Sequence, residues 1–342
     1  MDILKKLSLL LCTPLLTACY TDFEPDIDST PVLCMNAVID AGEEFTVQLT
    51  HSWRYDDYKA YKADHTVTDG TVEVCADGNQ VCRAVYSEWT ETNADGVVRK
   101  LSGYRIPYKP QAAQEISLRA YSPEYGNAEA VVTIPFEPLT GPVKIDSTVQ
   151  VNNYLFEDDA FGDYVYQNFH ISMDIKLPVN DRSGVTEYFQ LAWESVDLSD
   201  EDVEFNCGNP EYDMEPIFSE HIDALETVFA SDAWGFTVFS DNSFRGGSYP
   251  LRLLFKNMSL HRISGVADNR LPEGCAIRLT LFSLDHNLYN WYMYDWHDSE
   301  SFVGLLGYIG LAQNTTTYSN VSTRAGLVVA RNRSVVEISI KN

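Results

Sequence analysis

Basic residues are scarce in this chain. Its 342 residues include 24 Lys and Arg against 50 Asp and Glu, so the formal net charge at pH 7 is −26. Such an excess of negative charge repels phosphate backbones, which argues against nucleic-acid binding, and it disfavours electrostatic docking onto anionic lipids. We interpret the charge as a means of keeping an exported protein soluble.

Long apolar runs are also missing. Leu7–Leu16 follows Lys5 and Lys6, is too short to span a bilayer and has the length of the apolar core of a secretory signal. The most apolar later segment, Phe302–Ala312, has eleven residues and is interrupted by three glycines. We therefore expect no membrane-spanning helix in the mature chain.

The sequence contains none of the common catalytic motifs. The Gly-x-Ser-x-Gly elbow of hydrolases, His-Glu-x-x-His, the P-loop, the dinucleotide glycine fingerprint and the EF-hand loop are all missing. The seven histidines are scattered without ligand spacing. We predict that the protein is not an enzyme.

Two acidic segments leave carboxylate chemistry as an alternative. Glu157–Asp163 and Asp200–Glu204 could supply the facing carboxylates of a glycosidase or the converging oxygens of a calcium site. Because a chain with 50 acidic residues forms such runs readily, we interpret both as solvated loops. We expect no cofactor, with calcium and a hydrolase that uses these loops as the less favoured alternatives.

The seven cysteines show no zinc-site spacing, since there is no Cys-x-x-Cys and no Cys/His cluster. Cys75 and Cys82 flank a predicted turn and are a candidate disulfide if their side chains share one face of the hairpin. Cys207 and Cys275 could pair only if the fold brings their loops together. Cys34 lies in an apolar strand and is expected to be a small buried hydrophobe.

The N-terminus has the pattern of an exported lipoprotein. Leu16-Thr17-Ala18-Cys19 reads as a bacterial lipobox, in which Cys19 receives lipid and becomes the first residue of the mature protein. We predict a signal peptide over residues 1–18 and lipid attachment at Cys19. Residues 19–31 are acidic and contain two prolines, which is typical of an extended tether.

Short alternating strands dominate the remaining sequence. Phe45, Val47 and Leu49 alternate with polar residues, the period of a half-buried strand. The Asp77-Gly78 turn between two β-rich runs predicts a hairpin. Further strands are expected at 116–121, 130–134, 143–151, 169–175, 189–193, 249–255, 276–282, 327–330 and 335–340.

One helix is expected near 284–297. Ser283 is a suitable N-cap, and Leu284, Leu288, Tyr292 and Trp296 fall four residues apart, which predicts one apolar stripe. We interpret that stripe as core contact.

The fold class that follows is mainly β, with two β-sandwich-like domains after the signal peptide. Residues 32–137 form an Ig-like N-terminal sandwich, and residues 138–342 form a larger C-terminal sandwich with the one short helix. The boundary is indicated by Pro135, Pro138, Gly141 and Pro142. In the first domain, a loop rich in aromatic residues offers Trp53, Tyr55 and Tyr58 as candidate ligand contacts.

Five blocks of the chain resemble the Bacteroidetes outer-membrane lipoproteins that carry domain of unknown function 4249. The resemblance covers nearly all of the mature chain and is spread over weak blocks. These are Pro31–Glu43, Gly103–Pro135, Phe239–Tyr249, Leu281–Tyr292 and Ser319–Val328. The last block lacks one glycine of the family pattern. The acidic residues after Cys19 also resemble the signal that sends such lipoproteins to the cell surface.

The resemblance implies a lipid-anchored protein of the outer membrane, facing outside, of a kind often encoded beside a TonB-dependent transporter. We expect a non-enzymatic accessory or ligand-binding partner of such a transporter. The alternative is an adhesin or fimbria-like subunit that donates its final strand, Val335–Ile340, to an open sheet edge. The oligomeric state is left open.

Overall fold

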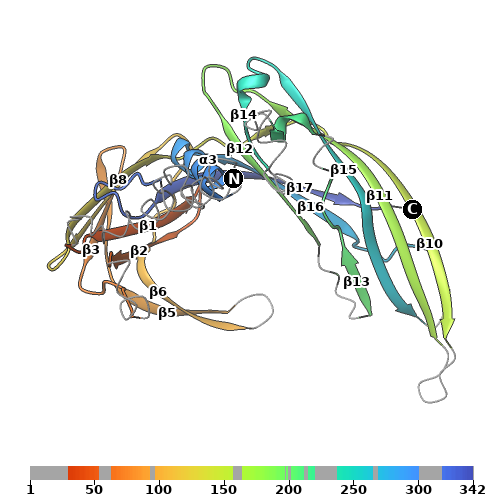
Figure 1. The fold of residues 1–342 in the computed structure, drawn as a ribbon, viewed down its shortest axis with the longest axis horizontal. Helices are drawn as coiled ribbons and strands as arrows, with labels where there is room; N and C mark the ends of the chain where they lie inside the picture. The colour runs from red at the N-terminus through yellow and green to blue at the C-terminus, as the bar shows by residue number, and fades with distance from the viewer. Residues whose placement is uncertain are drawn as a thin grey trace, which may run out of the picture. The chain divides into compact units, whose positions relative to one another are not determined.

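The computed structural model describes residues 30–53, 63–92, 97–156, 164–196, 198, 202–211, 215–219, 237–264, 269–299 and 318–341 (Figure 1). The predictions on Cys19, the tether, Tyr55, Tyr58 and the acidic loop 157–163 lie outside these residues. Of the segment formed by residues 1–31 and 53–63, only Thr30, Pro31, Trp53 and Ala63 are described. The fold below is that of residues 32–52 and 64–341.

The described chain is mainly β, as predicted, and its strands form three sheets. The strands of the first half are β1 (Leu33–Asp40), β2 (Phe45–His51), β3 (Thr71–Ala76), β4 (Asn79–Val85), β5 (Ser87–Thr92), β6 (Val98–Ile106), β7 (Glu115–Ser122) and β8 (Gly126–Thr133). The elements of the second half are β9 (Leu139–Thr140), β10 (Lys144–Phe156), β11 (Tyr164–Asn180), β12 (Tyr188–Ser195), β13 (Val203–Asn206), η3 (Pro216–Ser219), β14 (Val238–Ser240), η5 (Asp241–Ser243), β15 (Ser248–Ser264), β16 (Ala276–Leu284), the α-helix α3 (His286–Ser299) and β17 (Val328–Ser339).

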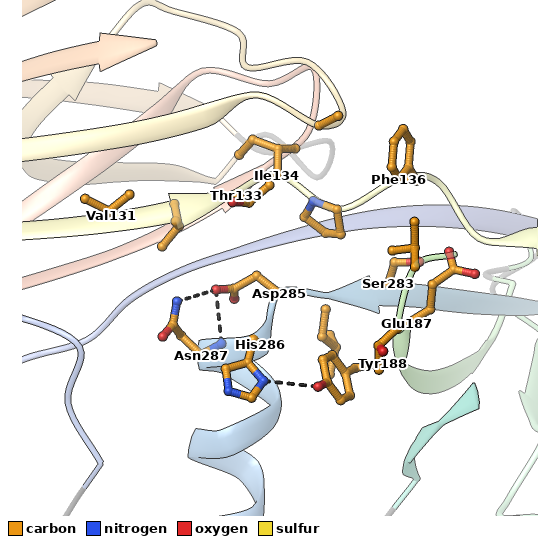
Figure 2. A pocket seen from close by; sticks show the side chains of 16 residues that line it. Val131, Thr133, Ile134, Phe136, Glu187, Tyr188, Ser283, Asp285, His286 and Asn287 are labelled. Carbon is orange, nitrogen blue, oxygen red and sulfur yellow. Dashed lines mark hydrogen bonds between the residues drawn. The ribbon is translucent and has the colours of Figure 1, made fainter. Parts of the chain in front are cut away.

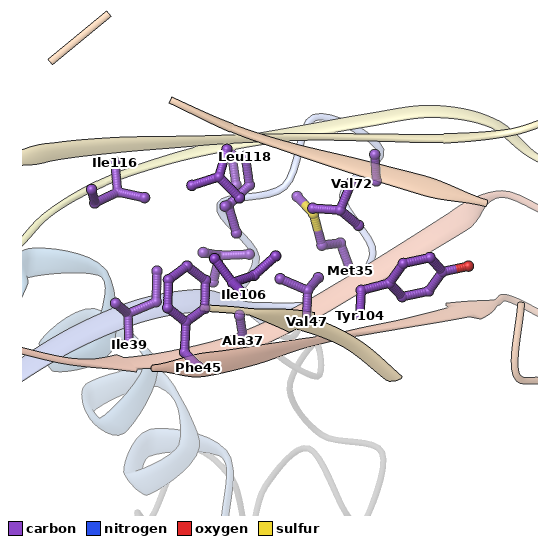
Figure 3. Close-up of a cluster of buried hydrophobic side chains, with 14 of the residues drawn as sticks. Met35, Ala37, Ile39, Phe45, Val47, Val72, Tyr104, Ile106, Ile116 and Leu118 are labelled. Atoms are coloured by element: carbon purple, nitrogen blue, oxygen red, sulfur yellow. The ribbon is translucent and has the colours of Figure 1, made fainter. Parts of the chain in front are cut away.

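The first half packs a sheet containing β1, β2 and β6 against the sheet β4-β3-β7-β8. Figure 3 shows Met35, Val47 and Tyr104 from the first of these sheets turned toward Val72 and Leu118 of the second. These side chains are fully buried because one side of each strand is apolar at every second position. The predicted Asp77-Gly78 hairpin is present, and the strands expected at 116–121 and 130–134 pair with each other as β7 and β8.

The hairpin between β3 and β4 shows how the local sequence sets the turn. Asp77 has φ 49° and Gly78 has φ 77°, the left-handed backbone that a two-residue hairpin turn requires. Cys75 pairs with Gln80 and Cys82 with Val74, across a register shift. Cys82 packs on the core whereas Cys75 lies on the other side of β3, and both thiols are free. The Cys75–Cys82 disulfide that we considered is therefore not formed.

The second half packs the sheet β10-β11-β15-β13 against β12 and β16. Its core is built from alternating residues of the two longest strands, such as Phe169 on β11 and Phe255 on β15, against Phe189 on β12. Cys207 and Cys275 are buried here, each as a free thiol. Each half thus packs one sheet against another, which agrees with the predicted mainly β, sandwich-like fold.

A parallel junction joins the two halves into one sheet. β17 pairs with β1 in parallel from Ala37↔Val328 to Asp40↔Arg331, and with β16 in antiparallel orientation along residues 331–339. The resulting sheet has eight strands in the order β14-β12-β16-β17-β1-β2-β6-β5. Val328 and Ala330 accordingly belong to the first core, and Ile338 belongs to the second. The division at residue 137 stays a prediction, and the structure adds that the last strand serves both cores.

Two local predictions at the C-terminal end are wrong. The two strands predicted at 327–330 and 335–340 are replaced by the single strand β17, Val328–Ser339, because its residues from 331 to 339 pair with β16 without interruption. The helix begins two residues later than expected. β16 runs to Leu284, which pairs with Tyr188, so Ser283 is held in the sheet and Asp285 is the cap. No helix within the described ranges has the length and apolar character needed to cross a membrane.

Candidate functional site

A cavity of about 290 Å³ lies where three segments distant in sequence meet (Figure 2). The segments are 131–136 at the end of β8, 185–188 leading into β12, and 283–287 between β16 and α3, and the single residue Ala113 before β7 completes the lining. Val131, Ile134 and Phe136 supply apolar wall, while Glu187 and His286 supply polar groups. A mostly apolar cavity with a few polar groups is the usual form of a small-molecule site.

Asp285 forms the N-cap of α3 at this cavity. Its carboxylate accepts hydrogen bonds from the backbone N–H groups of Asn287 (3.1 Å), Leu288 (3.1 Å) and Ala330 (3.0 Å). Burial raises the pKa of the carboxyl, and these donors act in the opposite direction. Since its oxygens are occupied by backbone donors, Asp285 fixes the helix start against β17 and is not poised to exchange protons with a ligand.

Tyr188 and His286 form a polar pair at the same cavity. The Tyr188 hydroxyl and His286 Nδ1 lie 3.1 Å apart, as Figure 2 shows, and the Tyr188 ring stacks on Tyr289 of α3 with centroids 4.2 Å apart. Burial raises the pKa of Tyr188, so its hydroxyl stays protonated at neutral pH. The pair offers a ligand hydrogen bonds next to an aromatic surface.

Buried carboxylates lie beside the cavity in a cluster that sequence reasoning missed. Glu187 Oε2 accepts from the backbone N–H of Arg182 (3.0 Å), and Asp241 Oδ2 accepts from the backbone N–H of Glu187 (3.2 Å). Asp181 Oδ2 accepts from the backbone N–H of Gly246 (2.6 Å). Burial raises the pKa of Glu187 and of Asp241. The available signal was the Phe239–Tyr249 block, which contains Asp241 and Gly246.

This geometry supports binding better than acid–base catalysis. Each of the three carboxylates accepts a backbone hydrogen bond at one oxygen, whereas Glu187 Oε1, Asp241 Oδ1 and Asp181 Oδ1 are buried without a hydrogen-bond partner among the described residues. Arg182 Nε lies 3.6 Å from Glu187 Oε1. A glycosidase instead needs two carboxyl groups that face each other across open space. Within the described ranges, no group of three His, Cys, Asp or Glu side chains could hold a metal ion. The cavity can accept a small apolar group with one polar end.

The predicted ligand contacts Trp53, Tyr55 and Tyr58 belong to the segment that contains residues 53–63. Trp53 is 46% exposed, and Tyr55 and Tyr58 lie outside the described residues together with Cys19. Of the second acidic run, Asp202 and Glu204 are described, and Glu204 lies on β13 opposite His261. The helix stripe is partly confirmed as core contact, because Leu288 is buried and Tyr292 packs on the same cluster. The Trp296 side chain lies outside the described part.

Comparison with known proteins identifies the family of this chain. The model of the family "Domain of unknown function (DUF4249)" matches residues 20–329. The chain belongs to this family. The DUF4249 match contains most of both cores, all three cavity segments and the first two residues of β17, and it ends before Ala330, Ile338 and Ile340. No curated protein and no solved structure matches the chain in the corresponding comparisons.

Proposed function

We propose that the protein is a non-enzymatic lipoprotein of the outer membrane, anchored through Cys19 and facing outside, that serves a TonB-dependent transporter as an accessory or ligand-binding partner. The observation that carries the proposal is Leu16-Thr17-Ala18-Cys19 directly behind an apolar run. Bacterial lipoproteins attach by several acyl chains at such a cysteine, and several chains give stable anchoring where a single chain does not.

The cavity supports the ligand-binding part of the proposal. Its apolar wall and the Tyr188–His286 pair fit a small molecule with one polar end. Membership of DUF4249 agrees with the resemblance on which the partner is proposed.

The adhesin alternative has less support. Val335–Ser339 is already paired with β16 inside its own chain, from Thr280↔Val335 to Ala276↔Ser339. Donating this strand to a neighbouring subunit would first require that ladder to open, at the cost of its hydrogen bonds and of Ile338 in the second core. The strand is therefore a poor donor.

Affinity purification from outer membranes in mild detergent tests the partner. The tagged native protein should bring down a TonB-dependent transporter in repeated preparations. A matched variant, Val185→Arg, introduces a charge into the cavity at a residue that is 40% exposed, so it should leave the fold and the complex intact while lowering ligand occupancy measured by native mass spectrometry. Repeated recovery of the lipoprotein alone would refute the partner.

Surface exposure is tested separately on intact cells. A membrane-impermeant amine reagent should label this protein to the same extent before and after outer-membrane permeabilisation. Labelling that requires permeabilisation would place the body on the periplasmic side and remove the outward orientation from the proposal.

A further inference from the structure

β10 is a long edge strand with one open side. It pairs along its 13 residues with β11, from Lys144↔Lys176 to Phe156↔Tyr164. It stands at the end of the order β10-β11-β15-β13, and no described strand pairs with its outer side (Figure 1). An edge of this length spans about 44 Å and presents a row of unpaired backbone N–H and C=O groups.

β10 lacks the features by which natural edge strands avoid pairing. Its charges are confined to Lys144 and Asp146, and the ten residues Ser147–Phe156 contain no charge, proline or glycine. The other edge strands of the described sheets are shorter, between two and eight residues; β4, β5, β8 and β13 carry a charge, and β9 and β14 do not. Ile145, Tyr154 and Leu155 on β10 are 46%, 50% and 67% exposed. Such an edge is expected to accept another strand.

The sequence of β10 is complementary to itself in antiparallel orientation. When two copies pair about a twofold axis at Gln150, the residue numbers of each opposed pair add to 300, and no like charges meet. Lys144 lies opposite Phe156, and Asp146 lies opposite Tyr154. The remaining opposed pairs are Ile145 with Leu155, Ser147 with Asn153, Thr148 with Asn152, and Val149 with Val151. Apolar residues therefore meet apolar residues on the face of β10 that carries the partly buried Val149 and Val151.

The charge distribution also favours this occupant. The chain has a net charge of −26, but Lys144 and Asp146 cancel within β10. Two copies can therefore approach through this strand with less repulsion than through the acidic remainder of the surface. We propose that the outer side of β10 pairs with β10 of a second copy of this chain, in antiparallel register centred on Gln150, to form an isologous dimer.

Sedimentation velocity of the full-length protein in mild detergent tests the dimer. The wild-type chain should sediment as a dimer, and its dissociation constant should fall as salt rises from 0.05 to about 0.5 M, because screening reduces the repulsion between the acidic bodies. A monomer at every salt and protein concentration would overturn the proposal, as would a chain that stays monomeric and binds only a strand of a different protein.

Two double variants test the register with nearly identical changes. Thr148 and Asn152 are exposed and face the uncharged Ser172 and Asn168 on β11, so charges there should leave the monomer folded. Thr148→Lys with Asn152→Lys places Lys opposite Lys twice and should weaken the dimer at least about tenfold. Thr148→Lys with Asn152→Asp places Lys opposite Asp twice and should keep it. Equal thermal unfolding of the two variants verifies the fold.

A disulfide bond across the twofold axis at residue 150 tests the register directly. Gln150→Cys brings the two introduced thiols opposite each other and should form a covalent dimer on mild oxidation. Thr148→Cys separates the two thiols by four residue steps along the strand, about 13 Å, and should not. Dimers that resist both lysine substitutions, or that cross-link equally through both cysteine variants, would overturn the β10 interface.

Discussion

The two cores are built from different residues. The buried part of the first contains Val, Ala, Ile, Leu and Met, with Phe45 and Tyr104 as its aromatic residues. The second contains six phenylalanines and two methionines: Phe169, Phe189, Phe218, Phe239, Phe244, Phe255, Met173 and Met258. Buried polar side chains divide in the same way. Ser122 lies in the first half, and the second half holds Gln167, Glu187, Glu215, Thr237, Ser240, Asp241, Ser283 and Asp285.

This difference indicates a division of tasks within one continuous sheet. The first half is an aliphatic scaffold. Its buried polar groups are mainly backbone N–H and C=O groups, which pair with each other between neighbouring strands. In the second half, carboxylates are buried beside the cavity, which lowers the free energy of unfolding. Buried ionisable groups are concentrated at functional sites in many proteins, so the second half is where we expect ligand contact.

The junction shared by both halves should give the largest effect. Gly326 has φ +98°, and a Cβ there would clash with the Met35 carbonyl oxygen and lie 2.7 Å from the Met35 nitrogen. Gly326→Ala should therefore lower the free energy of unfolding by about 3–5 kcal/mol in urea titrations. Gly42→Ala is the matched control, since Gly42 has φ +75° with no atom within 4 Å, and should cost about 1 kcal/mol. Equal losses would contradict the close approach at the junction.

Removal of one hydroxyl tests the scaffold half. Tyr104 is fully buried; its hydroxyl donates to the Val67 carbonyl (2.8 Å) and accepts from the Gly70 N–H (3.0 Å). Tyr104→Phe leaves both backbone groups unpaired and should destabilise the protein by about 1–3 kcal/mol. Tyr121→Phe removes a hydroxyl from a side chain on a half-exposed residue and should change stability by less than about 0.5 kcal/mol. Chemical denaturation of the two variants compares them.

Removal of one buried charge from the second half should stabilise the protein, whereas the substitutions at Gly326 and Tyr104 should destabilise it. Burial raises the pKa of Asp241, with Asp181 adding to the rise, so the stability contributed by this group is present below the unfolded pKa of about 4 and is lost as pH rises through the folded pKa. Asp241→Asn keeps an oxygen to accept from the Glu187 N–H and should raise the melting temperature by about 2–4 °C at pH 8, with little change at pH 4.

Asp174 provides the control for that pH dependence. Its hydrogen bonds from Arg252 hold the pKa of Asp174 below its usual range, so its contribution is present above the unfolded pKa and is lost as pH falls. Asp174→Asn should therefore lower the melting temperature at pH 8. Thermal melts of both variants at pH 4 and pH 8 test the comparison. Changes in melting temperature that have the same sign for the two variants at pH 8 would contradict it.

Strands with strict alternation were predictable, and their full lengths were not. Phe169–Ile175 predicts part of β11, but the ladders to β10 and β15 extend β11 from Tyr164 to Asn180. Polar residues such as His261 enter β15 because the neighbouring strands supply hydrogen bonds that local propensity does not indicate. The four-residue spacing of apolar residues predicted the helix. Its predicted start was wrong because Ser283 belongs to β16.

The candidate site could not be predicted from local pattern. The ladder between β12 and β16 brings 185–188 beside 283–287, and the side-chain amide of Asn332 on β17 donates to the Pro135 carbonyl of the third segment. β17 in turn pairs in parallel with β1, whose residues lie nearly 300 positions away. Nothing within either strand specifies that partner, since both have the alternation of an ordinary half-buried strand. Burial in the folded chain raises the pKa values of Asp241 and Glu187, and the local sequence does not indicate that burial. The predicted lipobox at the N-terminus, by contrast, is a local sequence pattern, and lipid attachment at Cys19 stays a prediction.

Cys19→Ser tests the central claim of lipid anchoring most directly. Membrane fractionation after growth with an alkyne-labelled fatty acid should find the wild-type chain labelled and in the outer membrane. The variant should be unlabelled and released into the soluble fraction, with an unchanged melting temperature because Cys19 precedes both cores. Retention of the variant in the outer membrane at wild-type levels would contradict the anchor.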